Sequence, residues 1–113
     1  MKKIYILVNL QVEGVHSWSS CDITQVSYLK NIHRHQFYIR VEKSVSHTDR
    51  DIEIIKFKRE IKQYLINKYW CEKYQACNFG NMSCEDICID IDKQFKTNLV
   101  KVTEDNENGA ILK

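Results

Sequence analysis

Three histidines have the residue type and the spacing of a metal site. His16 ends one extended run of the chain, and His33 and His35 form an HRH triplet at the start of another. Side chains two residues apart in a strand point to the same face, and an adjacent strand can bring a third imidazole beside them. Three protein nitrogens with a fourth position left open are the ligand set of a catalytic zinc site. The three histidines are therefore candidate zinc ligands, although for an isolated HxH an ordinary strand histidine is the better interpretation.

The elements that must position the histidines follow from hydrophobic periodicity. Alternating residues predict strands at 4–12, 36–45 and 99–103 and a strand piece at 52–57. Apolar residues at helical spacing predict an amphipathic helix over 57–69, and Ser83 with Asp86 forms a capping-box variant that starts a second helix ending near Lys96. Residues 14–31 form a long insertion that contains His16, and residues 71–82 form a connection. We predict one α+β domain over 1–113, an antiparallel sheet with two helices on one face.

Length and charge narrow the classes of protein. A chain of 113 residues with 43% hydrophobic content has a small core, so self-association into a homo-oligomer is expected. The net charge of +2 gives no basic stripe, and nucleic-acid binding is therefore unsupported. The apolar run near the N-terminus is too short and too alternating for a membrane helix and lacks a cleavage site for a signal peptide. We expect no membrane partner.

The five cysteines favour reduced thiols. Cys21 stands alone, and the other four contain no pair at the two-residue separation of zinc ribbons. Cys84 and Cys88 lie one helical turn apart among apolar residues, so small core side chains are the simplest interpretation. An odd count without a secretion signal indicates a cytoplasmic protein, of a bacterium or of the host cell if a phage encodes it.

Four fragments in one order resemble the family of 6-pyruvoyl- and 6-carboxy-tetrahydropterin synthases. They are VEGVH ending at His16, IHRHQFYIRVE from Ile32, NMSCEDI from Asn81 and VKVTEDNENGAI from Val100. The resemblance covers nearly the whole chain. It implies the tunnelling fold, in which sheets and helices of several subunits form a barrel, with a trimer or hexamer as the assembly and pockets between subunits.

The resemblance also implies roles for individual residues. His16, His33 and His35 match the family's zinc ligands. Glu104 matches the carboxylate that anchors the pterin ring, and a carboxylate suits this role because it accepts two parallel hydrogen bonds from a guanidine-like ring edge. Ser83 occupies the place of a Thr or Ser near the ring, although a helix N-cap is an equally good account of it, and Glu85 belongs to the same end of the pocket.

At the positions of the family's catalytic residues, this sequence departs from the family pattern. The Cys that serves as general base shortly before HxH is replaced in the stretch TQVSYLKNI, which offers Ser27 or Leu29 instead. An Asp-His pair after the first helix is replaced by Cys71 and Glu72. Proton transfer needs a group of suitable pKa within hydrogen-bond reach, and both usual groups are missing.

Two functions from different classes follow. The first is a family member that binds a purine-, pterin- or nucleotide-like molecule without the usual catalysis, with sequestration of that ligand as its role. The alternative is an active zinc-dependent synthase-type carbon–oxygen lyase that uses Cys21, Cys71 or Glu72 as its base. A third possibility is an interaction subunit in which the histidines are relics.

Overall fold

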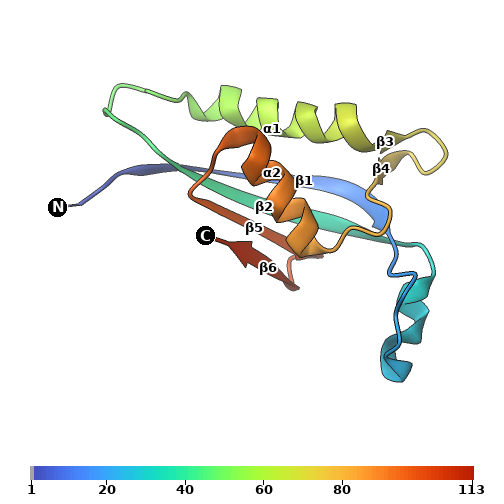
Figure 1. Cartoon of the computed structure of the whole chain (residues 1–113). Helices are drawn as coiled ribbons and strands as arrows, with labels where there is room; N and C mark the ends of the chain where they lie inside the picture. Colours follow the sequence, from blue (N-terminus) through green and yellow to red (C-terminus); the bar gives the residue numbers. More distant parts are fainter. Residues whose placement is uncertain (1) are drawn as a thin grey trace.

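A single six-stranded sheet organises the chain in the computed structural model, which describes residues 2–113. The strand order is β3-β4-β1-β2-β5-β6. Two α-helices lie on one face of this sheet, and a 3-10 segment, η1, projects beyond its end (Figure 1). The elements are β1 Tyr5–His16, η1 Thr24–Lys30, β2 His33–Ser44, α1 Ile54–Tyr69, β3 Trp70–Cys71, β4 Ala76–Asn78, α2 Cys84–Phe95, β5 Leu99–Glu104 and β6 Asn108–Leu112.

The centre of the sheet is a long antiparallel ladder between β1 and β2. It runs from the pair Tyr5 and Ser44 at one end to the pair His16 and His33 at the other. Strand β2 also pairs antiparallel with β5, and β5 with β6. The predicted antiparallel sheet is correct for these strands, but β4 pairs parallel with β1 at Gly14 and Val15.

The core lies between the sheet and the two helices. Strand alternation places the cross-strand pairs Val8–Val41, Leu10–Ile39 and Val12–Phe37 on the covered face, and all six side chains are buried. Helix α1 contributes the buried stripe Phe57, Ile61 and Leu65, and α2 contributes Ile87 and Ile91. This confirms the predicted α+β class with helices on one face. No helix among residues 2–113 has the length and apolar character needed to cross a membrane.

The predicted strand piece at 52–57 is wrong, because helix α1 already begins at Ile54. The side chain of Glu53 accepts hydrogen bonds from the backbone N–H groups of Ile55 and Lys56 and caps the helix. These bonds satisfy donors that a helix start otherwise leaves unpaired. The isoleucines at 52, 54 and 55 indicated a strand by type, but the cap and the buried helical stripe outweigh that preference.

Other boundaries also differ from the sequence prediction. The first strand extends to His16, and the insertion contains η1. Residues 71–82, predicted as a connection, include part of β3 and all of β4, and the turn after residue 104 leads into β6. The capping box that starts α2 is confirmed, since Ser83 and Asp86 each bond the backbone N–H of the other.

Candidate metal centre and groove

Strand register brings the candidate residues together at one end of the covered face. His16 pairs with His33, Gly14 pairs with His35, and Phe37 pairs with Glu104 across the ladders. All of these residues have the same parity as the core positions on their strands, so they continue the helix-covered face beyond the apolar core.

The three imidazoles could hold a metal ion. One ring nitrogen from each of His16, His33 and His35 lies within 4.8 Å of the others. His16 is buried, and the other two are half-buried. The ring centroids lie 4.6 to 5.4 Å apart in edge-on arrangements. The structure therefore brings together all three residues that the sequence indicated as candidate metal ligands.

Each imidazole is oriented by an oxygen acceptor at Nδ1. His16 Nδ1 donates to the Met82 carbonyl oxygen at 2.8 Å, and His33 Nδ1 donates to the Asn31 carbonyl oxygen at 2.8 Å. His35 Nδ1 donates to Asp105 Oδ2, also at 2.8 Å. An imidazole whose Nδ1 carries the proton presents a bare lone pair at Nε2, which is the arrangement that metal-binding histidines show.

Two of the Nε2 atoms face the carboxylate of Glu104. His16 Nε2 lies 3.0 Å and His35 Nε2 3.6 Å from the oxygens of Glu104. Despite these distances, both nitrogens are buried atoms without a hydrogen-bond partner among the described residues. An imidazole lone pair and a carboxylate that face each other repel unless a cation or a proton lies between them. The donor set therefore fits a metal cation.

Electrostatics favour the neutral, metal-binding form of the buried histidine. Burial lowers the pKa of His16, and the neighbouring His33 and His35 act in the same direction, against the Met82 carbonyl and Glu104. The pKa of the Asp105 carboxyl is also lowered, first by its hydrogen bond from His35 and then by the Gln36 backbone N–H. Asp105 thus stays ionised while it holds the His35 ring.

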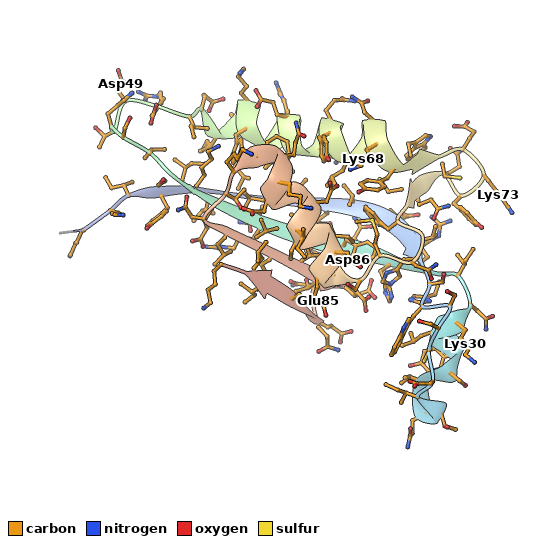
Figure 2. The ribbon with its side chains drawn as sticks, in the orientation of Figure 1. Lys30, Asp49, Lys68, Lys73, Glu85 and Asp86 are labelled. Atoms are coloured by element: carbon orange, nitrogen blue, oxygen red, sulfur yellow. The ribbon has the colours of Figure 1, made fainter. Side chains whose placement is uncertain are left out.

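A groove of about 780 Å³ opens beside the histidines. The start of α2 and the loop before it form one wall, and the beginning of the insertion forms the other; Figure 2 shows Glu85 and Asp86 at this end of α2. The Ser17 N–H donates to the Gly80 carbonyl at 2.8 Å, and the Ser19 N–H donates to Asn81 Oδ1 at 3.0 Å. These bonds tie the two walls together.

Gly14 allows an aromatic cluster to pack beneath the site. A Cβ at this position would lie 2.5 Å from Phe79 Cε2 and 3.0 Å from Phe37 Cε2. The Phe37 ring in turn packs edge-on against His16 and His35, with centroids 5.2 and 5.8 Å away. The absent side chain therefore lets the rings that support the histidines approach the backbone of β1.

The predicted ligand-binding residues all line the groove. Glu104 does so at the end of β5, and its side chain is 31% exposed. Ser83 lines the groove and is also the N-cap of α2, so both roles considered for it are compatible with one position. Glu85 is exposed in the first turn of the same helix.

Sequence reasoning missed four residues that shape the site. Asp105 and the carbonyl groups of Met82 and Asn31 orient the three histidines. Cys84, interpreted as a core residue, is buried but also lines the groove. Burial, followed by the nearby Glu104 carboxylate, raises the pKa of Cys84 to about 12, so its thiol stays protonated at neutral pH. Asp105 could have been suspected because it follows Glu104 directly in the sequence. No sequence pattern indicates that a backbone carbonyl will orient a histidine.

The three residues considered as the base of a lyase lie away from the groove lining. Cys21 is buried within the insertion, where its thiol approaches the carbonyl oxygens of Ile23 and Val26. Cys71 and Glu72 lie in and after β3, and none of the three lines the groove. Of the two residues that the resemblance aligns with the general-base Cys of the synthases, Leu29 lines the groove and Ser27 does not.

Comparisons with known proteins give no family for this chain. A scan against protein-family models finds no match, and a search of curated proteins finds no significant relative.

Proposed function

We propose that this chain is a zinc-binding, pterin synthase-like protein that holds a purine-, pterin- or nucleotide-like molecule in the groove without the catalysis usual in that family. The observation that carries the proposal is the set of three imidazoles whose Nδ1 atoms are occupied while two buried Nε2 atoms, among the described residues, lack a partner beside Glu104. Sequestration of the bound molecule is the proposed role.

The choice of zinc rests on the donor set. His16, His33 and His35 offer nitrogen ligands only, and three such ligands with an open position suit zinc. When bound, zinc would act as a Lewis acid and polarise an oxygen of the small molecule in the groove. The protein residues keep the imidazoles neutral and oriented, through the acceptors at Nδ1 and the burial of His16.

The ligand class rests on the charge of the groove. Glu85, Asp86 and Glu104 line it, and no Lys or Arg of residues 2–113 does so. Carboxylates attract the N–H-rich edge of a guanine or pterin ring, and Trp18, which is 38% exposed at the groove, offers a surface for stacking. The same charges oppose a triphosphate chain, which supports binding of the ring over turnover of the family substrate.

The lyase alternative requires a base within reach of the ligand. The three residues considered for it, Cys21, Cys71 and Glu72, lie outside the groove lining, and the Cys84 thiol in the lining is held protonated. These observations favour the binding function. A lyase would need another group, supplied by a neighbouring subunit in the proposed inter-subunit pocket.

Self-association into a trimer or hexamer is part of the proposal. Strand β6 is an edge of the sheet, and the Tyr5–Glu13 portion of β1 has only β2 as a strand partner among the described residues. Tyr28 is 64% exposed and Ile111 56% exposed, so apolar area is available for contacts between subunits. Light scattering that finds only a 13.5 kDa monomer at all working concentrations would contradict this part.

Native mass spectrometry of the purified protein tests the function directly. We expect an oligomer with one zinc per subunit and a co-purified molecule whose mass fits a purine or pterin. If the protein takes up no zinc when zinc is supplied, the histidines do not form a metal site. If it consumes dihydroneopterin triphosphate, the lyase function replaces the binding function.

The substitution Glu104→Gln tests the ring anchor. It keeps the shape but replaces an acceptor by a donor, so the affinity for the co-purified molecule should fall about 30- to 1000-fold, or about 2 to 4 kcal/mol. Glu107→Gln is the matched control, because Glu107 is exposed in the turn three residues later. Calorimetry that finds equal affinities for both variants would exclude Glu104 as the anchor.

A further inference from the structure

A second polar hollow, of about 560 Å³, lies on the side of the sheet opposite the groove. Tyr38, Arg40, Lys101 and Thr103 line it, and each alternates with a core residue of β2 or β5. Lys58 and Lys62 of α1 also line it, along the portion of β1 that no strand beyond β2 pairs with among residues 2–113. We call this hollow the basic trough, because its lining includes these four cationic side chains and no acidic side chain of the described residues.

Two pairs of like charges line the basic trough. Arg40 and Lys101 lie directly opposite one another in the β2–β5 ladder. Lys58 and Lys62 are four residues apart on α1 and therefore neighbours on the helix surface. Like charges in either arrangement destabilise the fold slightly, and an anion bound between them would relieve this repulsion.

The cations of the trough are largely free to bind a ligand. Arg40 uses Nε to bond Glu42 at 2.9 Å, which leaves the terminal nitrogens of its guanidinium. Lys58, Lys62 and Lys101 form no ion pair among residues 2–113, whereas the nearby Lys56 pairs with Glu60. A planar guanidinium beside mobile ammonium groups is a combination that recognises phosphate oxygens.

A buried hydroxyl adds a second, independent feature. Thr103 is only 6% exposed, and its Oγ1 has no hydrogen-bond partner among the described residues. An unpaired buried hydroxyl costs free energy. Thr103 pairs across the ladder with Tyr38, whose phenol also lines the trough. The Tyr38 hydroxyl can donate to an anion, and rotation of the Thr103 side chain would bring its hydroxyl to the same ligand, whereas the lysines alone would attract an anion without orienting it.

We propose that the basic trough binds a phosphate-bearing anion, in a site separate from the metal centre. The shared chemistry is a chain of phosphate groups, and it can belong to a free polyphosphate or to a nucleotide. The proposal does not depend on the function of the groove, since the strand residues of the trough lie on the other face of the sheet.

Calorimetry with tripolyphosphate tests the proposal on full-length protein freed of metal by dialysis. We expect saturable binding that Lys101→Gln weakens about tenfold and Arg40→Gln at least as much, since a charge-assisted hydrogen bond contributes about that factor. Lys101 is exposed and Arg40 is half-buried, so neither variant empties the core and both should fold. Lys73→Gln is the matched control, because Lys73 lies in the turn after β3, away from the trough (Figure 2).

His33→Ala separates the trough from the metal centre. This variant should bind tripolyphosphate with unchanged affinity. Loss of binding in His33→Ala, an equal loss in Lys73→Gln, or no saturable binding at all would each overturn the proposal. Parallel titrations with tripolyphosphate and guanosine triphosphate identify the source of the phosphate. Equal affinities indicate that the trough contacts only the phosphate chain. Tighter binding of guanosine triphosphate, weakened by Lys101→Gln, indicates that the ligand is a nucleotide.

Discussion

The groove and the basic trough are built on opposite faces of the same strands, and their polar groups are held in different ways. At the metal centre, Nδ1 of each histidine is fixed by an acceptor. The three acidic side chains of the adjoining groove lie near the start of α2 or at the end of β5. In the trough, three lysines extend from exposed positions without ion pairs among residues 2–113.

This difference predicts different kinds of recognition. Imidazoles that hydrogen bonds already orient lose little freedom when they bind a metal, so the metal centre should discriminate by coordination geometry. Exposed lysines must be ordered by the ligand, so the trough should respond mainly to charge and to ionic strength. Covering one face of the sheet with helices thus produces a fixed site and leaves a more adaptable one on the other face.

The largest expected effect is the loss of metal from the groove in His33→Ala. A site reduced from three ligands to two should bind zinc more than about 100-fold more weakly, since even the loss of an outer hydrogen-bond partner costs about 10- to 100-fold. His47→Ala, which changes the exposed histidine after β2, is the control. Metal analysis and zinc titration give the readout, and unchanged occupancy in His33→Ala would mean that the metal binds elsewhere.

The orienting role of Asp105 should give the next largest effect. In Asp105→Asn, the amide oxygen can keep the hydrogen bond from the Gln36 N–H, and the amide NH₂ group then faces His35 Nδ1. Two donors would meet there, which disfavours the His35 tautomer that carries its proton on Nδ1 and binds metal through Nε2. Zinc affinity should fall about 10- to 100-fold, while tripolyphosphate binding to the trough should not change. Asp49→Asn makes the same charge change in the exposed loop before α1. Equal zinc affinities in the two variants would remove Asp105 from the site.

Stability should depend on the groove face more than on the trough face. Gly14→Ala places a Cβ 2.5 Å from Phe79, and this overpacking should lower the free energy of unfolding by about 1 to 3 kcal/mol. Gln11→Ala, on the exposed face of the same strand, should stay within about 0.5 kcal/mol. Denaturant unfolding of metal-free protein measures both values. A Gly14→Ala variant as stable as Gln11→Ala would show that the aromatic cluster tolerates the methyl group.

A smaller effect should come from Asp90, which links the helix that carries the trough lysines to the helix that borders the groove. Its carboxylate accepts from Tyr64 and Tyr69 Oη at 2.9 and 2.6 Å and from Lys68 Nζ at 2.8 Å; Figure 2 shows Lys68 on α1. Burial acts to raise the pKa of Asp90, but these donors outweigh it and lower the pKa below its ordinary value of 3.8. Asp90→Asn should therefore cost about 1 to 2 kcal/mol at neutral pH.

The pH dependence of this effect has a definite sign. Because the folded-state pKa of Asp90 is lowered, its stabilising contribution is complete above 3.8 and is lost as the pH falls through the folded value. The stability difference between Asp90→Asn and the unchanged protein should then shrink as the pH falls below 3.8. A difference that persists unchanged in acid would assign it to packing and not to the charge of Asp90.

The sequence predicted much of the fold because its central elements carry strong local patterns. The alternation over 36–45 and the Ser83–Asp86 capping box both correspond to observed elements. The start of α1 and the strand β6 were missed for opposite reasons. Glu53 caps the helix through a contact that outweighs residue preference, and β6 is an edge strand whose residues gain order only from pairing with β5.

The sequence by itself determined which three histidines form the candidate metal centre. The two-residue spacing of His33 and His35 places them on one face, and the position of His16 at the end of β1 sets it opposite His33. Only the tertiary structure decided how these side chains are held and what surrounds them. Met82 and Asp105 are 66 and 70 residues from the histidines they orient, and such contacts leave no local pattern. The grouping of Arg40 and Lys101 with the lysines of α1 likewise depends on strand register and helix placement, which the net charge of the chain does not reveal.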